Sequence, residues 1–124
     1  MAKWVLDAAL DAALDDIATC VTLTVCSGQP ANFAGIAAVA LAAVTLTAGD
    51  GNGDYTVADG DASGRKLTVA QQATIAIDTT GTATHVSLDD GSVLRYVTTC
   101  TSQALTDTGT VTVPAWDVEI ADPS

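Results

Sequence analysis

The first patterned stretch of the chain repeats apolar and acidic positions at helical spacing. Between residues 6 and 18, apolar side chains recur three or four positions apart and fall on one face: Leu6, Leu10, Leu14 and Ile17. Aspartates occupy the opposite face. This pattern predicts a short amphipathic helix whose leucine face packs against other elements.

Most of the remaining chain alternates apolar and polar residues with a period of two, which is typical of β-strands. The expected strands are short, rich in Val and Thr, and separated by Gly and Asp turns. They cover residues 21–26, 44–47, 55–57, 66–69, 74–77, 83–88, 93–99, 110–113 and 116–120. Residues 37–43 fit a helix or an extension of the following strand equally well. Pro114 favours an edge or a bend between the last two strands.

Many short strands at regular spacing predict a mainly β fold. We expect an antiparallel β-sandwich or barrel-like domain with one short N-terminal amphipathic helix. The 124 residues suffice for a single domain, residues 1–124. The apolar run at residues 33–48 is too short, too rich in alanine and too poor in basic flanks to predict a membrane span.

Aromatic residues are scarce, so the core is expected to consist of Val, Leu, Ile and Ala. Such a core is thin, and contacts between copies of the chain are one way to bury more apolar surface. The five aromatic residues are Trp4, Phe33, Tyr55, Tyr96 and Trp116.

The charge balance is strongly acidic and excludes two classes of partner. Four basic residues stand against fifteen acidic ones, for a net charge of −11. Nucleic-acid binding requires clustered Lys and Arg, and anionic membranes repel an acidic surface. We therefore expect neither nucleic acid nor a membrane as a partner. Every acid except Glu119 is an aspartate, which favours turns and caps.

Three cysteines, Cys20, Cys26 and Cys100, leave at least one thiol unpaired. The first residues lack the pattern of a secretory signal, so we expect synthesis in a reducing cytoplasm and free, buried thiols. A disulfide between Cys20 and Cys26, or between Cys26 and Cys100, is the less favoured alternative.

No catalytic constellation is recognisable in the sequence. The single histidine, His85, lies within an expected strand, and no Gly-x-Ser-x-Gly motif accompanies it. We interpret His85 as a structural or interface residue. The sequence therefore predicts a protein that is not an enzyme, with no catalytic residues and no cofactor.

The acidic loop at residues 50–61 is a weak candidate for a calcium site. Asp50, Asn52, Asp54 and Asp61 have the spacing of oxygen ligands in a calcium loop. Tyr55 stands where such loops have glycine, and the last ligand is Asp rather than Glu. Ordinary turn chemistry is the preferred interpretation.

Three residues are candidates for contacts with partners. Arg65, with Lys66, is expected to form salt bridges to Asp59 and Asp61, and alternatively to reach an acidic patch on a neighbouring chain. Trp116 and Trp4 are expected to be core or interface anchors rather than a carbohydrate-stacking surface.

Six segments of the chain, in this order, resemble a family of small structural proteins of long-tailed (siphovirus-like) phages and prophages. The resemblance covers essentially the whole chain, although the glycine-rich loop at residues 50–54 is longer than in some relatives. The six segments are residues 6–11 (Leu-Asp-Ala-Ala-Leu-Asp), 25–30, 59–66, 81–86, 96–105 and 114–123.

The resemblance implies a virion component of a bacteriophage, above all a capsid decoration (cement) protein on the capsid exterior, made in the bacterial host cytoplasm. Its partners would be the major capsid protein and copies of itself, with a homotrimer favoured because icosahedral shells have threefold sites. Two alternatives remain open. One is a low-copy tail or head-fibre component, and the other is a small β-sandwich that binds a glycan or calcium.

Overall fold

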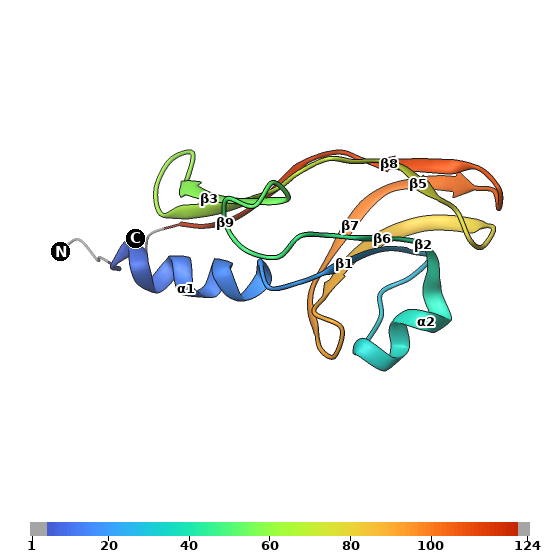
Figure 1. Ribbon diagram of the computed structural model, residues 1–124, viewed down its shortest axis with the longest axis horizontal. Helices are drawn as coiled ribbons and strands as arrows, with labels where there is room; N and C mark the ends of the chain where they lie inside the picture. The colour runs from blue at the N-terminus through green and yellow to red at the C-terminus, as the bar shows by residue number, and fades with distance from the viewer. Residues whose placement is uncertain (1–4, 122–124) are drawn as a thin grey trace.

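The computed structural model describes residues 5–121 and is mainly β, with antiparallel sheets and one short N-terminal helix, as the sequence predicts (Figure 1). The helical elements are α1 (Asp7–Ile17), a 3-10 turn η1 (Phe33–Gly35) and α2 (Ile36–Val39). The strands are β1 (Thr22–Cys26), β2 (Ala40–Thr45), β3 (Tyr55–Asp59), β4 (Arg65–Val69), β5 (Gln72–Ala76), β6 (Gly81–Asp89), β7 (Leu94–Leu105), β8 (Thr110–Val113) and β9 (Trp116–Ile120).

All nine expected strands are present, and two stretches differ from the expectation in extent. Residues 37–43, for which the sequence left two options, are divided between α2 and β2. β7 continues to Leu105 instead of ending near residue 99. Its pairing with β6 extends to the pair Gly81 and Leu105. Residues 101–104 are all exposed and show no alternation of apolar and polar side chains, so periodicity gives no strand signal there.

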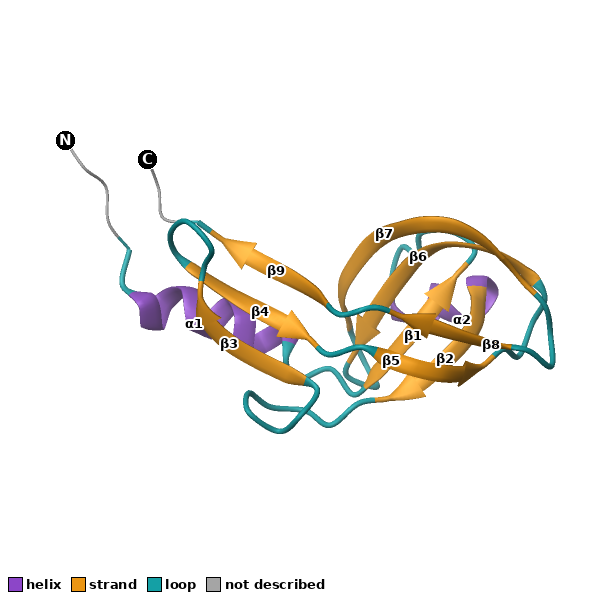
Figure 2. Ribbon diagram, turned by 90° about the horizontal axis from the view of Figure 1, so that it is seen from above, coloured by secondary structure: helices purple, strands orange, loops and turns teal. Residues whose placement is uncertain are grey.

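The strands form two connected parts (Figure 2). One contains α1 and the sheet β3-β4-β9; the other contains the sheet β2-β1-β6-β7 and the ribbon β5-β8. The ribbon β5-β8 lies beside β2. Just after β5, the N–H groups of Asp78 and Thr79 donate to Leu41 O of β2, at 2.8 and 3.1 Å. The spatial order β8-β5-β2-β1-β6-β7 therefore makes a barrel-like wall that is not hydrogen-bonded between β7 and β8.

Two long chain segments run side by side from one part to the other (Figure 1). The last pair between β4 and β9 is Val69 opposite Trp116. The first pair between β5 and β8 is Gln72 opposite Val113. Both segments therefore advance by three residues between these two pairs. The register is thus unchanged across the interruption. Pro114 lies in this interruption, where it has no N–H to donate, and the sequence predicts an edge or a bend at this position.

A single hydrophobic core runs through both parts. Leu14 of α1 and Ala18, which caps the C-terminus of this helix, belong to the same buried cluster as residues of β1, β4 and β6. Tyr55 is fully buried, and its hydroxyl donates to Cys20 O at 3.0 Å, which links β3 to the segment before β1. The largest fully buried side chains are Tyr55, Leu14, Leu23, Leu67, Leu88, Val25, Val69, Cys20, Cys26 and Ser87.

The leucine face of α1 is buried as predicted, except at its start. Leu10 and Leu14 are buried and Ile17 packs against the core. Leu6 is 55% exposed, because it is the N-cap residue and its backbone is extended. The face that holds the helix in place therefore begins at Leu10.

Leu14 is the helix residue on which folding should depend most. Its side chain is 0% exposed, so Leu14→Ala should lower the free energy of unfolding by about 2–5 kcal/mol through lost burial and the cavity left behind. Leu6→Ala removes the same atoms from an exposed site and should change it by less than about 0.5 kcal/mol. Urea denaturation followed by circular dichroism measures both, and equal losses would contradict this packing.

Candidate functional site

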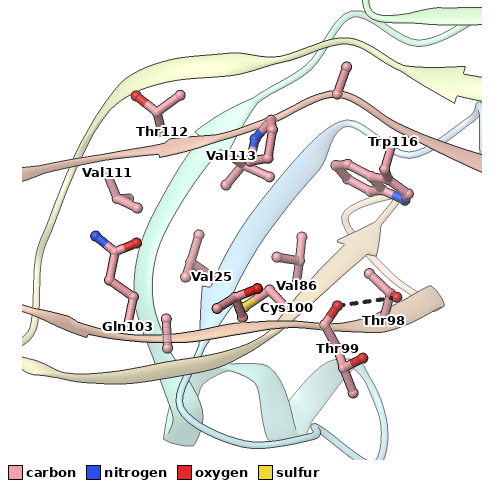
Figure 3. A pocket seen from close by; sticks show the side chains of 14 residues that line it. Val25, Val86, Thr98, Thr99, Cys100, Gln103, Val111, Thr112, Val113 and Trp116 are labelled. Carbon is pink, nitrogen blue, oxygen red and sulfur yellow. Dashed lines mark hydrogen bonds between the residues drawn. The ribbon is translucent and has the colours of Figure 1, made fainter.

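A pocket lies where the barrel-like wall is open (Figure 3). It has a volume of about 460 Å³, within the range of roughly 300–1,000 Å³ of protein pockets that hold ligands. Its side chains come from β1, β6, β7, β8 and the start of β9. They are Val25, Ala83, Val86, Thr98, Thr99, Cys100, Thr101, Gln103, Val111, Thr112, Val113, Pro114, Ala115 and Trp116.

The lining of this pocket carries no ionisable acid or base other than the Cys100 thiol, although the chain has fifteen acidic residues. Its inner wall is formed by Val25, Ala83 and Val86, which are all buried. Thr hydroxyls and the Gln103 amide supply neutral hydrogen-bonding groups. The pocket therefore suits neutral groups, because a charge brought here would lose water without gaining a charged partner.

Trp116 lies at one end of the pocket, as Figure 3 shows. The residue is half-buried and packs against the core, which agrees with its interpretation as a core anchor. Its indole Nε1 is buried and has no hydrogen-bond partner among residues 5–121. Trp4, the other tryptophan predicted to be an anchor, lies outside the described residues.

An irregularity in β7 shapes the open side of the pocket. Ala83 pairs with Gln103 and His85 pairs with Thr99, so residues 100–102 of β7 stand opposite the single residue Thr84 of β6. Extra residues in one strand bend it and increase its twist. The bulge thus turns β7 where it lines the pocket, and sequence periodicity gives no signal for it.

All three cysteines are free, and they differ in accessibility. Cys20 and Cys26 are fully buried, whereas Cys100 is half-buried and lines the pocket. Burial raises the pKa of the Cys20 thiol to about 12 and also raises the pKa of Cys26 and of Cys100. At neutral pH the thiols are protonated, and protonated thiols are poor nucleophiles.

His85 lies in β6 between Cys26 of β1 and Thr99 of β7. Its Nδ1 is 2.8 Å from Thr84 Oγ1, a contact between neighbours on one strand. His85 therefore lies in an interior strand of the sheet, and its interpretation as a structural or interface residue stays a prediction.

The four calcium candidates are engaged in other interactions. Within residues 5–121 no group of three or more His, Cys, Asp or Glu side chains is placed to hold a metal ion. Three of the four bond within or beside their own loops and the fourth pairs with a lysine. Val57 N–H donates to Asp50 Oδ1 at 2.8 Å, Asn52 Nδ2 donates to Ala48 O at 2.8 Å, Thr47 N–H donates to Asp54 Oδ2 at 2.6 Å, and Lys66 Nζ donates to Asp61 Oδ1 at 2.8 Å.

Arg65 joins its loop to the helix. The ion pairs expected at this loop are present, with Arg65 Nη1 2.6 Å from Asp59 Oδ1 and Lys66 paired to Asp61. Arg65 Nε also donates to Asp11 Oδ1 of α1 at 2.7 Å, which the sequence did not predict. Hydrogen bonds to Asp11 and then to Asp59 raise the pKa of Arg65. The guanidinium is thus engaged within its own chain.

Arg95 makes a second such link, between the β6–β7 turn and α1. Its Nη2 donates to Asp90 Oδ2 at 2.8 Å and its Nη1 donates to Asp16 Oδ2 at 2.9 Å. Backbone N–H groups of Val93 and Ser92, followed by Arg95, hold the pKa of Asp90 below its usual value. The pair with Asp90 could be predicted from the sequence, because the two residues are close in the chain. The contact with Asp16 could not, because Asp16 lies 79 positions away.

A second, more open hollow of about 440 Å³ lies between residues 31–34 and 92–94. It contains Phe33 and Val93, which are 39% and 49% exposed. The hollow forms a small apolar surface beside the β6–β7 turn.

The chain matches no family model, no curated protein and no solved structure. None of the helices between residues 5 and 121 is long and apolar enough to cross a bilayer.

The lowered pKa of Asp90 predicts a pH effect on stability. The ionised carboxylate stabilises the fold above its unfolded pKa of about 3.9, and this contribution is lost as the pH falls through the lower folded value. Asp90→Asn should therefore be less stable than the wild type at pH 7, and the difference should shrink below about pH 4. Urea denaturation across pH 2–7 checks this.

Asp78→Asn is the matched control, because it removes the same charge from an exposed turn. Two results would refute the role of Asp90. In one, the difference in free energy of unfolding between wild type and Asp90→Asn stays constant down to pH 2. In the other, Asp78→Asn shows the same loss as Asp90→Asn.

The cysteines should react in a fixed order. In the folded protein N-ethylmaleimide should modify Cys100 alone, because Cys20 and Cys26 have no exposed surface. All three should react in 6 M guanidinium. Mass spectrometry of peptides after timed labelling measures the three rates, and modification of Cys20 or Cys26 at the rate of Cys100 would contradict the packing of β1.

Proposed function

We propose that this chain is a structural protein of a phage virion, a capsid decoration (cement) protein that binds the outside of the major capsid shell and stabilises it. The observation that carries the proposal is the uncharged, strand-lined pocket on a molecule with a net charge of −11. Such a surface suits docking to another protein, whereas the acidic remainder keeps the molecules apart in solution. The resemblance of six sequence segments to small phage proteins supports the same function.

The use of the basic residues also supports this function. Arg65, Lys66 and Arg95 are all paired with aspartates of their own chain. No basic side chain between residues 5 and 121 is left to form the phosphate-binding patch that nucleic-acid recognition requires. A protein that covers a DNA-filled shell benefits from this, because the packaged DNA does not compete for it.

The main alternative is a tail or head-fibre component, which needs the same solubility and docking surface. Only its copy number and its place on the particle distinguish it. A small glycan-binding module is a second candidate, favoured by the pocket and by the indole of Trp116 at one end of it. No observation on residues 5–121 favours the calcium alternative, which stays a prediction.

Quantitative mass spectrometry of purified virions tests the proposal. We expect a ratio of this chain to the major capsid protein of about one, because a decoration protein covers the shell at every symmetry-related site. Particles from which the chain has been removed should burst at lower temperature and regain their stability when it is added back. A handful of copies per particle would favour the tail or fibre, and absence from virions would refute a virion function.

A further inference from the structure

We infer that the gap between β7 and β8, which we call the seam, receives an extended, uncharged segment of the protein on which this chain docks. This segment would add as a strand to the edge of β7. The inference rests on the proposed function, which makes the major capsid protein the donor of the segment.

The first argument is that both sides of the seam are strand edges. Within residues 5–121, β7 pairs with β6 alone and β8 pairs with β5 alone. These two strands follow each other in the chain and are joined only by residues 106–109, yet they are not hydrogen-bonded to each other. Consecutive antiparallel strands joined this closely ordinarily form a hairpin. The pocket thus lies between two edges whose backbone groups face no strand.

The second argument concerns features of the chain itself on the two sides of the seam. The bulge at residues 100–102 bends β7 next to the pocket. On the opposite side of the pocket, Pro114 follows the last residue of β8 and cannot extend a ladder of hydrogen bonds with an N–H. Both features lie at the pocket, where β7 and β8 are not paired.

The third argument concerns the edge of β7. Residues 96–105 contain no charged residue, no proline and no glycine. Edge strands are commonly protected from further pairing by charges, especially Lys, or by Pro. Within residues 96–105 the bulge is the one such device. The charged residue of β7, Arg95, lies before this stretch and is paired with Asp90 and Asp16. A long uncharged edge of this kind is typical of a strand that is covered in the assembled state.

The chemistry of the seam defines the segment that fits it. Side chains of an added strand point alternately into the pocket and away from it. Those that point inward would meet Val25, Ala83 and Val86, so small or β-branched apolar side chains suit these positions. A charged side chain would be desolvated there without a partner. β-strand addition of this kind takes its affinity from main-chain hydrogen bonds.

The inference is tested on particles from which this chain has been removed. Thr101→Lys places a charge on the exposed edge of β7, beside the pocket, and should weaken binding to the particles about tenfold or more. Thr56→Lys makes the same change on β3, an exposed edge strand of the other sheet, and should bind within about twofold of the wild type. Both variants should unfold at the same urea concentration as the wild type.

Cys100 provides a second readout at the same place. Its reaction with N-ethylmaleimide should slow at least about tenfold when the protein is bound to particles, because the added segment covers the pocket. A benzophenone maleimide attached to Cys100 should, on illumination, cross-link to one uncharged segment of the major capsid protein. The control is the same reagent on Thr56→Cys in a Cys100→Ser background, which should not label that segment.

The outcomes separate this inference from the proposed function. If the wild type binds particles but Thr101→Lys binds equally well and Cys100 stays reactive, the seam is not the docking site, and the decoration function stands. If Cys100 becomes protected with protein concentration alone, a second copy fills the seam and the inference is wrong. If the wild type does not bind particles at all, both proposals fail.

Discussion

The packing of α1 is the constraint on which the rest of the structure depends. Leu14 places the helix in the core, and two arginines from different sheets reach it from opposite parts of the molecule: Arg65 of β4 bonds to Asp11, and Arg95 of β7 bonds to Asp16. Partly exposed ion pairs contribute little energy individually. Burial of the leucine face supplies the stability, and the two arginines link the helix to both sheets.

The local elements of this fold are predictable from the sequence, whereas their arrangement is not. Alternation of Val and Thr marks the strands, and the Leu-Asp-Ala-Ala repeat marks α1, because both patterns follow from which side chains each element buries. The second half of β7 escapes prediction because residues 101–104 show no alternation of apolar and polar side chains. Its strand conformation comes from pairing with β6, which is a tertiary effect.

The candidate site also has one part that the sequence predicts and another that depends on the fold. Trp116 attracts attention in the sequence as an aromatic residue beside a proline, and the structure places it at the pocket. The rest of the pocket consists of Val, Thr and Ala, which are the commonest strand residues and carry no signal of their own. The pocket lies between the bulged part of β7 and the segment around Pro114, and only the fold brings these together. For the acidic loop the sequence offered two interpretations, and the bonds of Asp50 and Asp54 favour turn structure.

The unchanged register across the bend at Pro114 has a mechanical consequence. The segments β4–β5 and β9–β8 form one antiparallel ribbon that joins the two parts of the molecule. Backbone hydrogen bonds of antiparallel strands lie perpendicular to the strand direction. A pull that slides one segment along the other therefore loads many of these bonds at once, instead of opening them one after another. The ribbon should therefore resist sliding of its two segments past each other more strongly than separation of the segments from one end.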